Sequence, residues 1–348
     1  ELQEPLADDL LETAVSHIIQ HHDALRLRFA QTPSGWSQTH ANDEAGRIVT
    51  AIDLSHLSQN EQTQRLQQEA NQLQASLDLA EGPLARLLYV HLGPNRPDQL
   101  LITIHHLLID SISWRILLED LQRIYQQLAA EKPAQLPFKT TSFQQWAGEL
   151  TAYAASDELR QEIDYWASLA KAERPSPLPQ DFPSSPNANQ VQNADRIIVT
   201  LSQSETDALL RDVPPVYGTE INDILLTALA QTFCQATGNR KLWLSLEGHG
   251  REDILPDVDL SRTVGWFTSI YPVVLDLQLT TSPGEAIKQI KEQIRRIPHH
   301  GIGHGLLRYL HPDTAVRQQM ASLPTPEISF NYLGQFDQTM ADLPFTPS

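Results

Sequence analysis

The sequence contains a single cysteine, Cys234, among its 348 residues. One thiol cannot form an internal disulfide, so a disulfide-stabilised secreted scaffold is excluded, and we expect a protein of the reducing cytoplasm. Basic residues are also few, since 25 Lys and Arg stand against 43 Asp and Glu and leave a formal net charge of −18. Because a nucleic-acid backbone is itself anionic, this charge argues against nucleic acid as a partner.

Long apolar runs are absent from the sequence as well. No stretch reaches the roughly 18 residues that a membrane span requires, so we expect no association with a membrane. The composition, with 41% hydrophobic and 20% charged residues, is typical of a globular protein. The sequence begins with Glu1 and has no basic leader followed by an apolar segment, so we expect it to be a piece of a longer polypeptide.

The spacing of apolar residues predicts helices and strands mixed in both halves of the chain. In the first half, helical spacing predicts helices at 6–18, 60–74 and 114–128. Alternating or continuous apolar residues predict strands at 25–29, 84–92 and 99–104. In the second half, Thr219 can cap a helix that ends at Gly238. A further helix is predicted at 283–297, with strands at 241–246, 270–277 and 327–332.

A stretch rich in Pro, Ser and Asn separates these two halves. We interpret residues 174–190 as a linker between an N-terminal lobe, 1–173, and a C-terminal lobe, 191–348. The length agrees with two lobes of about 150 residues each. The sequence therefore predicts a two-lobed α/β sandwich.

Two adjacent histidines, His105 and His106, lie where a predicted strand ends and a predicted helix follows. An imidazole with a pKa near 6.5 is largely neutral at cellular pH and is a good general base. Neighbouring residues of a strand point to opposite faces, so at most one of the two can reach a given site. Asp110 could hold this turn in place. From these residues alone, two structural histidines are an equally good interpretation.

The stretch 105–114, HHLLIDSISW, resembles the HHxxxDxxSW signature of the condensation-domain superfamily of nonribosomal peptide synthetases. The resemblance implies a V-shaped, two-lobed fold similar to chloramphenicol acetyltransferase, with the active site in the cleft between the lobes. It implies that His106 is the catalytic histidine. It also implies supporting roles for His105, Asp110 and Trp114. Stretches at 21–29 and 77–84 are similar to other motifs of the superfamily.

Four later stretches are similar to motifs of the epimerization branch of this superfamily: EGHGRE at 247–252, TVGWFTSIYP at 263–272, PHHGIGHG at 298–305 and NYLGQFD at 331–337. Epimerization removes a proton from one face of an α-carbon and returns one on the other face, which requires two acid–base groups, or one such group and a well-placed water. The resemblance implies Glu247 as the group that acts with His106. Contacts to the substrate or its enolate are expected from Asn331, Tyr332 and Ser113.

The resemblance also implies what the domain works with. The thioester is held on the phosphopantetheine of a peptidyl carrier domain, so we expect no intrinsic cofactor. Adjacent adenylation and condensation modules of the same synthetase are further expected partners, and the domain itself is expected to be monomeric. The histidines are not arranged in an HExxH-type motif and have no cysteine partner, so we expect no metal.

Two positions depart from the family pattern. Ser111 stands where the family usually has Gly, which adds a side chain at a turn where a positive φ is possible. His304 stands where the family has Tyr, and we expect it at the rim of the cleft. Two alternatives stay open, namely a condensation domain that forms peptide bonds and a non-catalytic module that docks carrier domains. Substitution of Glu247 separates the first alternative, because condensation should survive it.

Overall fold

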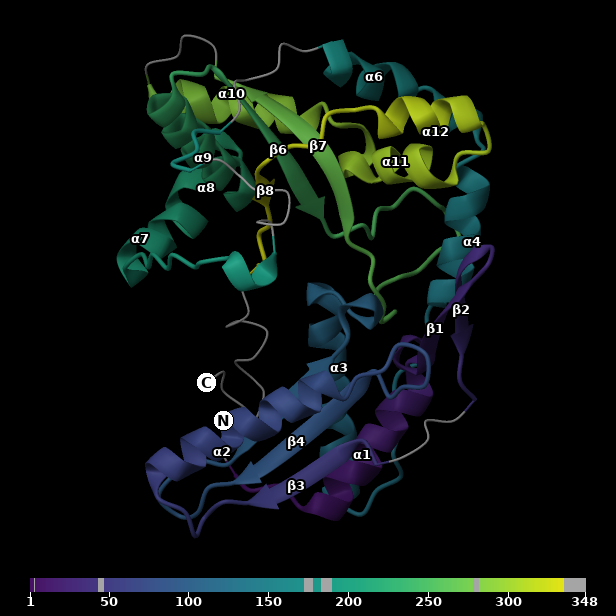
Figure 1. Ribbon diagram of the computed structural model, residues 1–348, viewed down its shortest axis with the longest axis vertical. Coiled ribbons are helices and arrows are strands. Elements are labelled where there is room, and N and C mark those ends of the chain that lie inside the picture. Colours follow the sequence, from purple (N-terminus) through teal and green to yellow (C-terminus); the bar gives the residue numbers. More distant parts are fainter. Residues whose placement is uncertain (3, 43–46, 172–177, 183–189, 278–281, 335–348) are drawn as a thin grey trace. The chain divides into compact units, whose positions relative to one another are not determined.

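The computed structural model describes residues 1–2, 4–42, 47–171, 178–182, 190–277 and 282–334 (Figure 1). They form two units. Unit 1 comprises Glu1–Glu149, Asp253–Thr268 and the described residues 333–334, and unit 2 comprises Leu150–Glu252 and Ser269–Tyr332.

This division differs from the predicted boundaries at 173 and 191. The physical reason is that residues 253–268 pack with the N-terminal residues although they follow a strand of unit 2, and composition along the chain carries no sign of such a return. Most of the predicted linker, residues 174–177 and 183–189, lies outside the described residues.

Unit 1 contains a three-stranded sheet in the order β3-β4-β5. Strand β3 (Val49–Asp53) runs parallel to β4 (Ala85–His91), and β4 runs antiparallel to β5 (Gln99–Ile104). The predicted strands at 84–92 and 99–104 are therefore confirmed within one residue at each end.

Helices cover both faces of this sheet (Figure 1). Leu87 and Tyr89 of β4 belong to a core that includes residues of α1 (Asp8–His21) and α3 (Ser111–Ala129). Leu88 and Val90 face the opposite way and pack with leucines of α2 (Gln59–Ala75). The apolar run Leu87–Val90 within β4 is thus the sequence of a strand that is buried on both faces.

A hairpin follows α1 in unit 1. The 3-10 helix η1 (Asp23–Arg26) leads into β1 (Leu27–Thr32), which pairs antiparallel with β2 (Gly35–His40). The strand predicted at 25–29 therefore begins two residues later. Strand β2 was not predicted, because nearly all of its side chains are exposed and leave no buried face for the pattern to reveal.

Unit 2 contains a second three-stranded sheet, in the order β7-β6-β8. Strand β6 (Lys241–Gly248) runs antiparallel to β7 (Ser269–Asp276) and parallel to β8 (Ser329–Phe330). Strand β8 is much shorter than the predicted 327–332. The two longest helices of this unit's described part are α9 (Ile221–Thr237) and α10 (Pro283–Arg295).

The remaining helical elements are short. Helix α4 (Phe143–Tyr153) contains the boundary between the units. The others belong to unit 2: α5 (Asp157–Arg160), α6 (Ile163–Lys171), η3 (Val191–Asn193), α7 (Gln203–Asp207), η4 (Ala208–Asp212), α8 (Val213–Tyr217), η5 (Pro298–Gly301), α11 (Ile302–Gly305), η6 (Leu306–Leu310) and α12 (Thr314–Ala321).

The ends of α9 show how local chemistry sets a helix boundary. The predicted cap, Thr219, is wrong by one residue, because Glu220 is the N-cap and its backbone N–H donates to the Asp223 carboxylate at 2.9 Å. The helix ends as predicted at Gly238, which has a φ of 72°. Within the described ranges, no helix is both long and apolar enough to cross a membrane.

Candidate active site

His106 lies in unit 1, in the turn η2 (His106–Leu108) that directly follows β5. The backbone N–H of His105 donates to the Leu84 carbonyl at 2.8 Å, and the His105 Nδ1 accepts from the Leu107 N–H at 3.2 Å. His105 is therefore engaged with the backbone of the turn. The His106 imidazole is exposed, whereas His105 is half-buried.

Asp110 fixes the start of α3 behind this turn. Its carboxylate is buried and accepts from the Ser113 N–H at 2.7 Å, as an N-cap does. It also accepts from the Phe267 N–H at 3.4 Å. Trp114, one turn along α3, packs partly buried against the core of unit 1. Asp110 is thus engaged with backbone N–H groups and Trp114 with the core, and their supporting roles stay a prediction.

Ser113 has a different place from the one expected. It is fully buried, and its hydroxyl donates to the Gly265 carbonyl at 3.0 Å and accepts from the Gly265 N–H at 3.1 Å. Both hydrogen-bonding capacities are therefore used by the backbone. Ser113 therefore ties residues 263–267 to α3, and its expected contact to the substrate stays a prediction.

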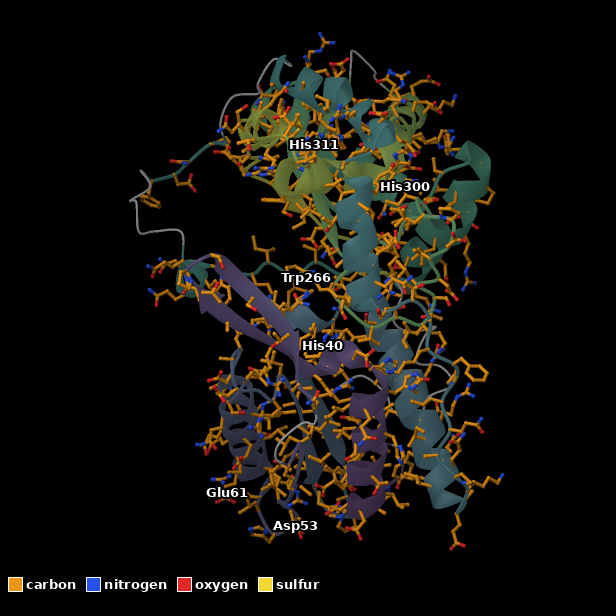
Figure 2. The ribbon with its side chains drawn as sticks, turned by 90° about the vertical axis from the view of Figure 1, so that its right-hand side faces the viewer. His40, Asp53, Glu61, Trp266, His300 and His311 are labelled. Carbon is orange, nitrogen blue, oxygen red and sulfur yellow. The ribbon has the colours of Figure 1, made fainter. Side chains whose placement is uncertain are left out.

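Trp266 is the residue of this region that the sequence left without a role. Its ring lies 5.4 Å from the His106 ring, centroid to centroid, and 39% of the residue is exposed. Phe267 beside it is buried and packs edge-on against Phe143 at 5.2 Å. No local pattern of the sequence shows that Trp266 is partly exposed between the buried residues Gly265 and Phe267. Figure 2 labels Trp266 among the side chains of the structure.

An ion-pair network anchors the segment that contains Trp266. The Arg262 guanidinium contacts Asp120 at 2.5 Å and Glu119 at 3.1 Å, both on α3. Asp120 is fully buried and also contacts the His22 Nε2 at 3.0 Å. Because a buried carboxylate is stable only when it is paired, this network fixes residues 253–268 to unit 1.

Glu247 lies in unit 2, one residue before the end of β6, where it pairs with Ile270 of β7. It is half-buried. Among the described residues, no hydrogen bond or ion pair engages its carboxylate. The carboxylate is available for a proton transfer.

Asn331 and Tyr332 directly follow β8 in unit 2. Strands β6 and β8 are parallel, with Leu246 opposite Phe330, and Glu247 and Asn331 each follow this pair by one residue. Asn331 is exposed and Tyr332 is half-buried. The end of this motif, residues 335–337, lies outside the described part of the chain.

The two departures from the family pattern are explained by their surroundings. Ser111 is the exposed first residue of α3 and adopts helical geometry, so no positive φ is required there. The expectation that His304 lies at a rim is wrong. Only 5% of the residue is exposed, and its ring lies 5.2 Å from that of Trp166. This burial lowers the pKa of His304 to about 4. The residues on both sides of it, 301–303 and 306–307, are buried as well, so His304 lies inside unit 2.

No group of three or more His, Cys, Asp or Glu side chains in the described ranges is arranged to hold a metal ion. The prediction of a reaction without metal or intrinsic cofactor stays a prediction.

A family model described as the Condensation domain matches residues 1–344. The chain belongs to the condensation-domain family. The chain spans less than a tenth of the length of two relatives that it matches. The chain is 46% identical over 342 residues to a linear gramicidin synthase subunit of Brevibacillus parabrevis, an alignment that covers 98% of the chain and 4% of that protein. It is 42% identical over 339 residues to surfactin synthase subunit 2 of Bacillus subtilis (strain 168), with 97% of the chain and 9% of that protein covered.

Solved structures confirm the predicted α/β fold. The epimerization domain from the third module of tyrocidine synthetase B is 38% identical and superposes with a TM-score of 0.89, over 96% of this chain and 75% of that one. The first condensation domain of the calcium-dependent antibiotic synthetase superposes with a TM-score of 0.73, over 96% of this chain and 74% of that one. At 17% identity, the second likeness concerns the fold alone.

Proposed function

We propose that the chain is the epimerization domain of a nonribosomal peptide synthetase. It inverts the α-carbon of an L-aminoacyl or L-peptidyl thioester held by a peptidyl carrier domain and delivers the D form. The observation that carries the proposal is Glu247, a half-buried carboxylate at the end of β6 that no described residue engages, within the EGHGRE stretch. The 38% identity with an epimerization domain supports the same branch.

His106 takes part as one acid–base group. Its imidazole is exposed, and Trp266 beside it restricts the orientations of the ring. An imidazole that is largely neutral near pH 7 can accept the α-proton of a thioester and return it. The hydrogen bonds of Asp110 and Ser113 hold the turn and the Trp266 segment, so the base does not have to be reoriented at each turnover.

Glu247 is the second acid–base group. Inversion requires that the proton leave one face of the carbon and arrive on the other, which one fixed base cannot do alone. The enolate that forms between the two transfers places negative charge on the thioester oxygen. The side-chain amide of Asn331, which directly follows β8, can donate a hydrogen bond to that oxygen.

The thioester belongs to the partner, so the proposal includes no cofactor of the chain itself. The carrier domain supplies phosphopantetheine, and the adjacent adenylation and condensation modules load and use the residue that is inverted. A cytoplasmic synthetase that makes D-containing peptides, with this domain acting as a monomer, is the setting that the proposal implies.

The test is deuterium incorporation from solvent at the α-carbon of an aminoacyl group loaded on a carrier protein. We expect exchange with loss of chirality in the wild type, and a fall of about 10² to 10⁴-fold in Glu247→Gln and in His106→Ala. The matched controls are Glu149→Gln and His40→Ala, which make the same changes at exposed positions. His40 is labelled in Figure 2.

Two outcomes would overturn the proposal. A wild type that forms peptide bonds without exchanging the α-proton would be a condensation domain. A wild type that binds the loaded carrier but does neither would be a docking module.

A further inference from the structure

The turn η5 in unit 2 contains an unusual run of backbone conformations. His299, His300 and Gly301 all have positive φ angles, of 42°, 48° and 86°. Glycine adopts this region freely, but for the two histidines it is unfavourable, and such conformations persist only where the surroundings hold them. The structure must therefore contain contacts that fix both histidines.

Each histidine contacts its own buried glutamate. The His299 Nδ1 lies 2.7 Å from the Glu162 Oε1, and the His300 Nδ1 lies 2.6 Å from the Glu252 Oε2. Glu162 also accepts from the Trp166 Nε1 at 2.9 Å. The turn is thus held by two similar pairs, one on each side.

The two pairs differ in what lies next to them. A Cβ atom added to Gly248, the residue after Glu247, would lie 3.6 Å from the His300 carbonyl oxygen. A Cβ added to Gly301 would lie 2.2 Å from the Tyr271 ring, and Tyr271 pairs with Leu246 across β6 and β7. The His300 side of the turn therefore packs directly against the end of the strand that carries Glu247.

Glu252 connects this turn to the segment that follows Glu247. Only 9% of Glu252 is exposed, and its Oε1 has no hydrogen bond from the described residues, although the His249 Nε2 lies 3.4 Å away. The backbone between them is tightly folded, with the Arg251 N–H donating to the His249 Nδ1 at 3.0 Å. Glu252 therefore contacts His300 with one carboxylate oxygen and lies beside His249 with the other, which joins the turn η5 to the segment that follows Glu247.

We propose that Glu252 and His300 are positioning residues, whose contact holds the end of β6 so that the Glu247 carboxylate is aimed at the α-carbon. The inference rests on the proposed function. The contact between Glu252 and His300 joins the segment after Glu247 to the turn η5, which packs against Gly248. A carboxylate displaced by about 1 Å transfers protons far less efficiently, so the aim of Glu247 affects turnover more than substrate binding.

The second pair provides a matched control within the same turn. The test measures kcat and KM for α-proton exchange with an aminoacyl-loaded carrier protein in Glu252→Gln and His300→Asn, against Glu162→Gln and His299→Asn. Asn tolerates a positive φ but is too short to keep the ion pair, so these variants remove the contact without adding backbone strain. For Glu252→Gln and His300→Asn we expect kcat to fall about tenfold with KM unchanged, and for the control pair we expect a kcat within about twofold of wild type.

A double variant tests whether the contact acts through Glu247. In a Glu247→Gln background, Glu252→Gln should cause no further loss, because residues that act as one unit are not additive. If Glu252→Gln does not fold, the exposed His300 side chain allows His300→Asn to test the same contact.

Equal kcat values in the two pairs of variants, or an additive loss in the double variant, would overturn the inference while wild-type exchange still upheld the proposed function. Absence of exchange in the wild type would instead overturn the proposed function.

Discussion

Ser113→Ala is the substitution whose effect the structure specifies most fully. The Ser113 hydroxyl is fully buried and both donates to and accepts from the backbone of Gly265, which is itself buried. The next residue, Trp266, packs on His106. One oxygen atom therefore joins α3 to the segment beside the candidate base.

The expected loss of unfolding free energy follows from two backbone groups of Gly265, its N–H and its C=O, which the substitution leaves without a hydrogen-bond partner. A buried N–H or C=O without a partner costs about 1–3 kcal/mol, so two of them give about 2–6 kcal/mol. Because the missing oxygen is small and the segment can move toward α3, we expect about 3 kcal/mol of unfolding free energy to be lost. The exchange rate should fall as well, because Trp266 loses its fixed position.

The assay is urea unfolding followed by circular dichroism, together with α-proton exchange under native conditions. Ser111→Ala is the matched control, since it removes an exposed hydroxyl two residues away and should change stability by no more than about 0.5 kcal/mol. A loss below about 1 kcal/mol in Ser113→Ala, or equal losses in both variants, would refute the argument that Ser113 ties the segment to α3.

Three further substitutions test other parts of the structure. Trp266→Ala should lower the exchange rate about tenfold, which corresponds to a barrier that is higher by about 1.4 kcal/mol. The melting temperature should change little, because the ring is partly exposed. A rate equal to that of the wild type would show that the His106 ring needs no restraint. Asp110→Ala should lower the unfolding free energy in urea by about 1–2 kcal/mol, because an N-cap is lost. Asp313→Ala, at the exposed N-cap of α12, should lower it by less. Equal losses would show that the additional hydrogen bond from the Phe267 N–H to Asp110 does not contribute to stability. His304 has a folded pKa of about 4 against an ordinary 6.5, so the unfolded chain binds more protons between these values and stability falls as the pH drops. From pH 7 to pH 5 this amounts to about 2 kcal/mol, which His304→Phe should abolish in unfolding curves at the two pH values; an unchanged pH dependence would mean that other groups are responsible.

The elements that could be predicted from sequence are those whose burial is written into the local pattern. Strand β4 is buried on both faces and contains the apolar run Leu87–Val90, and α9 ends at a glycine as its sequence indicates. Strand β2 could not be predicted, because its exposed residues form a strand only through pairing with β1. The same limit applies to residues 253–268, whose membership of unit 1 depends on ion pairs to α3 that no local pattern contains.

The candidate site divides in the same way. His106 and Glu247 were chosen from short motifs at strand ends, because the end of a strand is a local feature and the family resemblance assigns the chemistry. The sequence could not tell that Ser113 bonds a residue 152 positions away, that Trp266 packs on His106, or that His304 is buried beside Trp166. Local order along the chain determines which groups stand at the ends of the strands. Which groups reach a substrate and which are consumed by packing is decided only by tertiary structure, because burial and hydrogen bonding depend on residues that are distant in sequence.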